Sequence, residues 1–458
     1  MQVNTPEEVQ AIKTTEFMKE KIKQRPINKK KLVRRLLISV LMAVVMGLVA
    51  CITFIVLEPV INRKINSEEP LEEEPVNEIR FTEETEPEET LPEDLIADES
   101  EFAPPPVIIE QQGPLNDEQI EQVLSRMKFG LEDYMSLNMA VSDKVREVQK
   151  SLVDVIGITK DMDWFDDSYE SEHVISGVIV ADNGREMLIL ANMNSLSAYD
   201  SLEVLFKNGE SYPADIKKKD TATGLAVIAV NKNYLSQNTK NNLEIIKMGS
   251  SASRTTIGMP VIALGRPLGG SSTSMSFGYV SSYGSQIEFV DGAYSMITTD
   301  IYGSRSANGV LVSARGELIG IIDMEHNSED LKNLISGLGI SDLKILVEAL
   351  SNGRNIPYFG FYGTDVTEEI GRRMGIPVGV YIKSLEPDSP MLEAGMQSGD
   401  IITRFGGTSV ISYQELKTLM LTCEPEQSVL IEFMRQGADG YTDQSLIVAP
   451  KAQIQEGE

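Results

Sequence analysis

The chain has 458 residues, which is enough for two or three domains, and its hydrophobic fraction of 41% is ordinary for folded protein. The net charge of −28 is unevenly distributed, and no segment of folded character offers the basic face that a phosphate backbone requires, so nucleic-acid binding is disfavoured. The two cysteines, Cys51 and Cys423, lie in segments of different kind, which excludes a disulfide framework.

Residues 1–35 form a basic tail with ten basic and four acidic side chains. Residues 36–57 follow without a single charge, and these twenty-two residues are long enough to cross a hydrocarbon core of about 30 Å as a helix. Because basic residues beside a span stay in the cytoplasm, we predict a single-pass protein of the cell membrane. Its N-terminus is cytoplasmic and everything after Glu58 is extracytoplasmic.

Two other interpretations of this apolar run stay open. A cleaved signal peptide would normally have a shorter front end, yet Leu48-Val49-Ala50-Cys51 resembles a lipoprotein processing box that would leave Cys51 lipidated. The run continues to Leu57, which favours the transmembrane helix. A buried core helix is disfavoured because it would rarely be so uniformly apolar over this length.

Residues 58–113 are rich in Glu and Pro and cannot bury enough apolar area to offset chain entropy. We predict a disordered acidic linker, an extended tether, with the binding of a basic partner as the alternative. Residues 114–150 then carry apolar side chains at helical spacing, from Ile120 to Leu131. This predicts a helical lead-in or a self-association element.

Between residues 150 and 350 the sequence consists of short runs of strand-forming residues separated by Gly, Asn and Asp, which predicts a barrel or a sandwich. The predicted strands are 153–158, 174–181, 187–190, 202–206, 225–230, 260–264, 278–281, 296–298 and 317–322. An amphipathic helix over 341–350, with Ser341 as its cap, is expected to close this domain. A short linker leads to a last module at 357–450, and residues 451–458 are a tail.

Several blocks in order resemble the HtrA-type serine proteases, over about residues 140–450. They include Ser176-Gly-Val-Ile179, Gly258-Met-Pro-Val-Ile-Ala-Leu-Gly265 and the segment from Thr298 to Ile321, which resembles the family's nucleophile region. The resemblance implies a mainly β fold: a trypsin-like double β-barrel followed by a PDZ domain. It also implies assembly, because the family forms trimers, either as a homo-trimer or as a hetero-oligomer with an active relative.

The three positions that match the family's catalytic triad are all substituted. Aligning the nucleophile segment from Leu311-Val312 places Ala307 where the attacking serine belongs, Asn194 falls at the histidine position, and Gly224 falls at the aspartate position. A triad needs a hydroxyl, an imidazole to accept its proton and a carboxylate to orient that imidazole. The sequence therefore predicts no catalytic residue.

Other candidates for chemistry are weaker. Ser304 and Ser306 flank Ala307, and His326 lies in a polar stretch, so a displaced catalytic site stays open as the alternative. Arg305 stands where a glycine would shape the oxyanion turn, and it is a candidate to fill the vacated pocket. The carboxylates of residues 161–167 lack the spacing of a calcium loop, so we predict no metal and no cofactor.

The C-terminal module resembles a PDZ domain. Its Tyr358-Phe-Gly-Phe361 turn would present the backbone amides of Phe359, Gly360 and Phe361 to a peptide's terminal carboxylate. The opposite wall would be a helix around 414–421, with Met420 as a candidate groove residue. A PDZ fold used only for packing between domains is the alternative.

Together these features predict a membrane-anchored, extracytoplasmic pseudoprotease of HtrA type. It would bind C-terminal peptides or exported envelope proteins through its PDZ domain, as a scaffold or regulator. The resemblance leaves two other functions open. One is an active HtrA-type serine endopeptidase of envelope protein quality control with a displaced site, and the other is a purely structural envelope protein.

Overall fold

The computed structural model describes residues 76–81, 130–162, 168–196, 199–252, 256–270 and 272–453. Every described residue belongs to one compact unit, Glu74–Glu458. The predicted basic tail, the predicted transmembrane helix at 36–57 and Cys51 lie outside the described residues. Among the helices that are described, none has the length and apolar character needed to cross a membrane.

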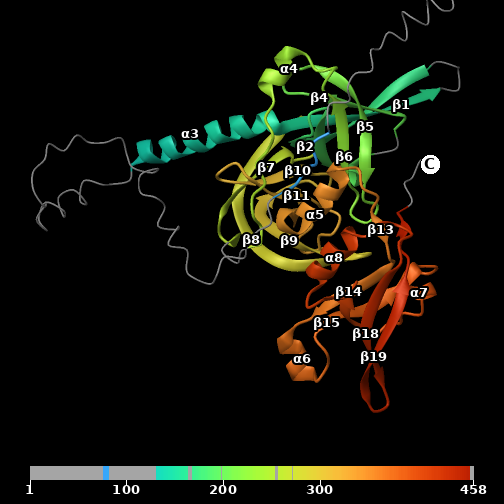
Figure 1. Ribbon diagram of the computed structural model, residues 1–458. Helices are drawn as coiled ribbons and strands as arrows, with labels where there is room; N and C mark the ends of the chain where they lie inside the picture. The colour runs from blue at the N-terminus through green and yellow to red at the C-terminus, as the bar shows by residue number, and fades with distance from the viewer. Residues whose placement is uncertain are drawn as a thin grey trace, which may run out of the picture. The chain divides into compact units, whose positions relative to one another are not determined.

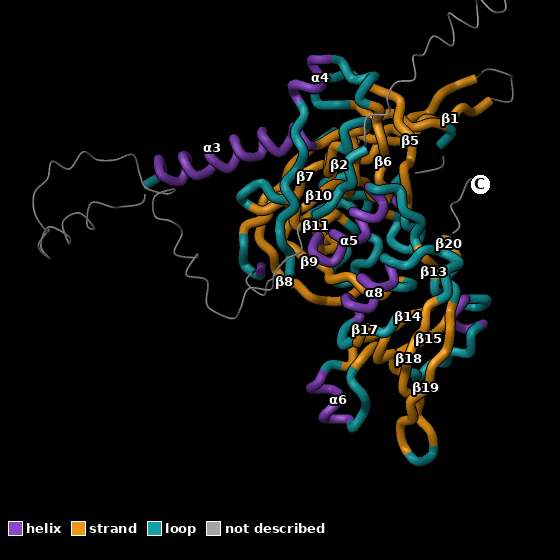
Figure 2. The backbone as a smooth tube through the Cα atoms, viewed as in Figure 1, coloured by secondary structure: helices purple, strands orange, loops and turns teal. Residues whose placement is uncertain are grey.

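The first domain begins with a closed barrel of six strands in the order β1-β2-β3-β6-β5-β4 (Figures 1 and 2). Its strands are β1 (Leu152–Met162), β2 (Ser168–Asp182), β3 (Glu186–Asn192), β4 (Ser201–Leu205), β5 (Ser211–Lys219) and β6 (Leu225–Asn231). Alternate side chains of β3 pack into two different hydrophobic cores, one inside the first barrel and one between the barrels. Met187 and Ile189 point into the barrel, whereas Leu188 and Leu190 face the neighbouring barrel, which explains the unbroken apolar run.

A second closed barrel follows, in the order β10-β11-β12-β9-β8-β7. Its strands are β7 (Pro260–Arg266), β8 (Ser274–Phe289), β9 (Gly292–Tyr302), β10 (Asn308–Ser313), β11 (Leu318–Ile322) and β12 (Leu334–Gly339). On β7, Val261 and Ala263 fill this barrel, and Ile262 and Leu264 pack between the barrels. The double barrel predicted from the sequence is confirmed.

Helix α3 (Leu131–Val148) precedes the barrels, α4 (Gln237–Asn242) lies between β6 and β7, α5 (Ile340–Ser351) follows β12, and α8 (Tyr413–Leu421) lies in the last domain. The predicted lead-in helix is described from Leu131 onward, and residues 114–129 lie outside the described part. Helix α5 forms where a helix was expected, but its N-cap is Gly339. Ser341 was predicted as the cap; its hydroxyl instead accepts a hydrogen bond from the Ser251 amide at 2.8 Å.

The last domain is a sheet in the order β14-β15-β16-β18-β19, with β17 paired to β16, and helix α8 packed against α5 (Figure 1). Its elements are β13 (Pro357–Tyr358), β14 (Phe361–Val366), α6 (Glu368–Met374), β15 (Gly379–Leu385), α7 (Pro390–Glu393), β16 (Ile401–Phe405), β17 (Thr408–Ser409), β18 (Val429–Gly437), β19 (Gly440–Val448) and β20 (Lys451–Ala452). Because β20 pairs with β13, the module continues past the predicted boundary at residue 450 (Figure 2).

Part of the predicted disordered linker is docked on the first domain. Within residues 76–81, the Ile79 amide donates to Asn352 Oδ1 at 2.9 Å, and Asn352 Nδ2 donates back to the Ile79 carbonyl at 2.8 Å. The Ile79 and Phe81 side chains pack against the central core, and Glu78 pairs with Arg354 at 3.1 Å. The prediction of an undocked tether is therefore wrong at this stretch, because two apolar side chains and a reciprocal amide pair suffice to hold it.

We predict that Asn352→Ala releases the docked stretch. Losing both hydrogen bonds to Ile79 should cost about 1–3 kcal/mol locally, which would speed exchange of the Ile79 amide roughly tenfold or more in hydrogen–deuterium exchange. Asn355→Ala is the matched control, because Asn355 lies close by in the chain and accepts from Lys218 instead. Unchanged exchange at Ile79 in Asn352→Ala would contradict the docking.

Candidate functional site

The three positions predicted to match the triad lie near one another in the fold. Asn194 lies in the short 3-10 helix after β3 (Met193–Ser195), Gly224 lies just before β6, and Ala307 lies just before β10. Asn194 and Ala307 line a cavity of about 410 Å³ between the barrels. Its other described lining residues are Asn192, Ser195, Arg305, Ser306, Asp323, Met324, Glu325, Asn327, Glu329 and Lys332, and no histidine is among them.

Asn194 fills the space that a side chain at position 224 would need. Gly224 has a φ of +73°, and a Cβ built on it would lie 2.0 Å from Asn194 Oδ1. The side-chain Nδ2 atom of Asn194 also lies 3.5 Å from the Thr223 carbonyl oxygen and 3.5 Å from Glu325 Oε2. Positions 194 and 224 are thus in contact, as triad neighbours would be, but they offer an amide and bare backbone, which cannot accept or orient a proton as an imidazole–carboxylate pair does.

The turn before β10 satisfies its own amides. The Ala307 N–H donates to the Ser304 carbonyl at 3.0 Å, and the Ser306 N–H donates to Ser304 Oγ at 3.2 Å. An oxyanion hole requires such amides to point at the position of the developing charge. Here both are engaged within the turn. Arg305 lines the cavity but remains largely exposed and lies 3.4 Å from Glu329 Oε1, so it does not fill the cavity as its position had suggested.

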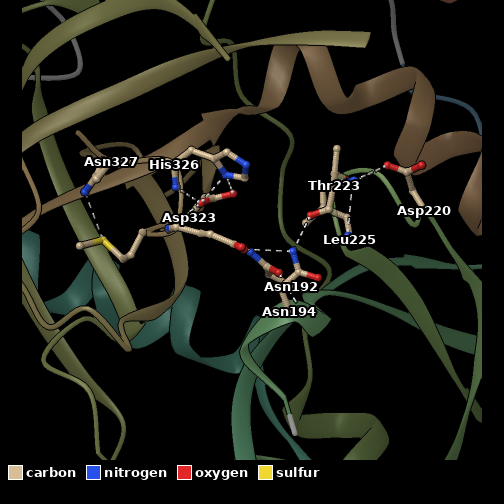
Figure 3. Close-up of polar contacts among 10 residues, drawn as sticks. Asn192, Asn194, Asp220, Thr223, Leu225, Asp323, His326 and Asn327 are labelled. Atoms are coloured by element: carbon tan, nitrogen blue, oxygen red, sulfur yellow. Dashed lines mark hydrogen bonds and ion pairs between the residues drawn. The ribbon is translucent and has the colours of Figure 1, made fainter. Parts of the chain in front are cut away.

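His326 and the two serines do not assemble a replacement triad. The His326 Nδ1 atom lies 3.0 Å from Asp323 Oδ2 (Figure 3). The imidazole also contacts the Phe289 ring in a tilted arrangement, with ring centroids 4.7 Å apart. The hydroxyls of Ser304 and Ser306 lie 3.0 Å from each other. The imidazole thus has a carboxylate partner, whereas the serines are paired with one another.

Asp220 is a buried carboxylate close to position 224 that the sequence reasoning missed. Its Oδ2 accepts hydrogen bonds from the Thr223 amide at 3.0 Å and from the Thr223 hydroxyl at 2.5 Å, and its Oδ1 accepts from Gln453 Nε2 at 2.9 Å (Figure 3). It is not among the residues that line the cavity of Asn194 and Ala307. Asp220 therefore shapes the turn that presents Gly224.

A second site lies at the predicted carboxylate-binding turn of the last domain. The amides of Phe359, Gly360 and Phe361 converge on one carboxylate, that of Asp291, at 2.8, 2.8 and 3.1 Å. We call these three amides the cradle. Gly360 has a φ of +80°, which favours glycine, and a Cβ there would lie 2.3 Å from Ser389 Cβ. The geometry is that of a carboxylate receptor, although its recognition of peptides stays a prediction.

The groove beside the cradle is partly closed. Met420, the predicted groove residue on α8, is buried, and it lines a pocket together with Asp291, Tyr294 and Lys417. Burial raises the pKa of Asp291 to about 7, while the three cradle amides lower it. No pattern in the sequence marked Asp291, which lies about seventy residues before the cradle in a two-residue turn between β8 and β9.

The two domains match known families. A model of the trypsin-like peptidase domain matches residues 175–321, and a model of the PDZ domain matches residues 341–444. The serine protease Do-like HtrA of Lactococcus lactis subsp. cremoris (strain MG1363) is 23% identical over 339 residues, covering 66% of this chain and 81% of the relative. The serine endoprotease DegS of Haemophilus influenzae is 27% identical over 281 residues, covering 59% and 76%.

Among solved structures, the HtrA-type protease AlgW with decapeptide aligns with a TM-score of 0.50 at 18% identity, covering 69% of this chain and 99% of that chain. At this identity the likeness concerns the fold. With the double barrel and the sheet described above, these matches define the class: a trypsin-like peptidase domain followed by a PDZ domain. Over both domains the chain is similar in sequence to HtrA-type serine proteases.

We predict that His326 titrates above its ordinary pKa of 6.5, because the hydrogen bond to Asp323 favours the protonated ring. The folded state then binds the proton more tightly than the unfolded state. This contribution to stability is complete below pH 6.5 and is lost as the pH rises through the folded-state pKa. NMR titration of the ring protons, compared with Asp323→Asn, measures it.

If His326 kept its titration midpoint in Asp323→Asn, the pairing with Asp323 would be refuted.

Proposed function

We propose that this protein is a membrane-anchored, extracytoplasmic pseudoprotease of the HtrA family that binds proteins or peptides through its PDZ domain. The observation that carries the proposal is the cavity lined by Asn194 and Ala307, with Gly224 in contact with Asn194 beside it. These positions provide an amide, no side chain and a methyl group, where peptide hydrolysis needs an imidazole, a carboxylate and a hydroxyl. Activity by the family mechanism is therefore not expected.

The turn that carries Ala307 gives independent support. Catalysis of acyl transfer depends on amides pre-organised for the oxyanion, and loss of one such donor typically costs about 100- to 1000-fold in rate. The Ser306 and Ala307 amides bond to Ser304 instead. Three triad positions are substituted, and the amides of the turn before β10 bond within the turn. Together these changes favour an inherited loss of catalysis over a single inactivating substitution.

The location rests on the sequence. Residues 36–57 have the length and the flanking charges of a single transmembrane helix, with residues 1–35 in the cytoplasm. The barrels and the PDZ domain would then work outside the cytoplasm, tethered by the linker.

Peptide binding rests on the cradle and on a relative. The HtrA-type protease AlgW, whose fold this chain resembles, has been solved with a decapeptide. In this chain the amides of Phe359, Gly360 and Phe361 already bind a carboxylate, which is the chemistry needed for a peptide C-terminus. We therefore propose C-terminal peptides as ligands of this protein, and exported or envelope proteins as its partners. We further propose that it assembles as a homo-trimer or with an active relative.

We predict that the full-length chain is not labelled by a fluorophosphonate probe and does not digest casein, with trypsin as the positive control. Ala307→Ser should remain unlabelled too, because no imidazole lines the cavity among the described residues. Labelling of the wild type that disappears in Ser304→Ala or Ser306→Ala would overturn the pseudoprotease proposal. It would establish the alternative, an active endopeptidase with a displaced site.

We predict that peptides with a free C-terminal carboxylate bind at least about tenfold more tightly than the same peptides with an amidated C-terminus, because charge-assisted hydrogen bonds are lost. Gly360→Val should abolish the difference. Gly407→Val is the matched control, since Gly407 also has a positive φ (+83°) but a Cβ there meets nothing within 4 Å. Fluorescence anisotropy of labelled peptides ending in Val or Phe measures both. Equal binding of both peptide forms would refute carboxylate recognition.

A further inference from the structure

The cradle of the PDZ domain holds a carboxylate from the protein's own protease-like domain. Both oxygens of Asp291 take part: Oδ2 accepts from the Phe359 amide at 2.8 Å and from Gly360 at 3.0 Å, and Oδ1 accepts from Gly360 at 2.8 Å and Phe361 at 3.1 Å. A peptide's terminal carboxylate would present the same two oxygens to the same donors. The side chain of Asp291 therefore stands where a ligand's C-terminus would be.

The backbone of Asp291 also behaves as a ligand backbone. Its N–H donates to the Phe361 carbonyl at 2.9 Å, at the first residue of β14. Binding of a peptide by β-addition uses main-chain bonds of this kind along the same strand. The residue has a φ of +59°, a conformation that is uncommon outside glycine but tolerated by aspartate, and this turn directs both its carboxylate and its N–H to the PDZ domain.

Contacts on both sides of Asp291 hold the turn in place. Glu288 of β8 pairs with Lys383 of β15, and the Ala293 side chain of β9 belongs to the PDZ core. Lys417 of α8 donates to the Asp342 carbonyl of α5 at 2.6 Å and lies 3.6 Å from the centroid of the Tyr294 ring. The turn is thus seated in a built interface rather than resting on a single contact.

We propose that Asp291 is an internal ligand that occupies the carboxylate site of the PDZ domain, so that a C-terminal peptide binds only when the β8–β9 turn leaves the cradle. This proposal rests on the peptide-binding function proposed above. Three amides cannot receive two carboxylates at once, so the internal and the external ligand exclude each other. The regulation is a competition for one set of hydrogen-bond donors.

The docked state is suited to displacement. Burial opposes the ionised form of Asp291 and offsets part of the gain from its hydrogen bonds. The affinity observed for a peptide equals its intrinsic affinity multiplied by the fraction of molecules with a free cradle. Removing the internal carboxylate therefore raises the apparent affinity without any new contact to the peptide.

The experiment compares the full-length wild type with Asp291→Asn and Asp291→Gly. Both residues tolerate positive φ, so the turn is kept while the carboxylate is removed. Hydrogen–deuterium exchange of the Phe359, Gly360 and Phe361 amides reports on the docking, and anisotropy of a labelled peptide with a free C-terminal Val reports on binding. Asp388→Asn is the control, because Asp388 is the other aspartate with positive φ (58°) in the described residues and lies in the loop after β15.

We expect the cradle amides to exchange at least about tenfold faster in both Asp291 variants and the peptide to bind about tenfold more tightly or better, with Asp388→Asn like the wild type. Amides that exchange equally fast in wild type and variants overturn the proposal. Equal affinity of the peptide for the wild type and for the Asp291 variants also overturns the proposal, but that result leaves the peptide-binding function intact. Faster exchange without binding of any free-carboxylate peptide refutes the peptide-binding function and with it the competition, leaving a contact used for domain packing.

Discussion

The buried guanidinium of Arg266 joins the two barrels, and the geometry of the cavity depends on this junction. Arg266 is 1% exposed on β7 of the second barrel, and it donates to Asp154 Oδ1 at 2.8 Å and Ser176 Oγ at 3.0 Å on strands of the first. Next to it, Asn308 accepts from the Ser176 amide at 2.8 Å. A buried charge without these partners would be strongly destabilising, so the barrels are held in one register. Ala307 directly precedes Asn308 and is fixed with it.

Much of the fold could be predicted from local patterns, because barrel strands bury alternate side chains and turns separate them. Three strands escaped that reasoning for physical reasons. Strand β5 carries a proline and three lysines, β12 is half glycine and serine, and β10 follows an irregular turn, so each is held by its neighbours in the barrel rather than by its own propensity. The docked residues 76–81 escaped too, because their composition is that of the linker around them.

Of the candidate site, too, one part could be predicted from the sequence and another part could not. The convergence of Asn194, Gly224 and Ala307 followed from the resemblance, since a conserved scaffold brings fixed positions together even after their side chains change. That Asn194 occupies the space above Gly224 could not be predicted, because it depends on a positive φ and a side-chain position. Asp291 was equally hidden: it contacts the cradle across a domain boundary, and no local pattern marks an aspartate in a two-residue turn as a ligand.

The two sites together indicate how such a protein can transmit a signal without chemistry. Binding and docking draw on the same donors, so by linkage a peptide favours the undocked state by as much free energy as docking opposes the peptide. The cavity beside Ala307 carries Asn194 and Ala307 at the positions predicted for the histidine and the serine, so we infer that this free energy acts on the docking of the two domains rather than on a reaction. The consequence of releasing Asp291 is then the exposure of protein surface. The surface released in this way would comprise Asp291 and the cradle amides that it binds when docked.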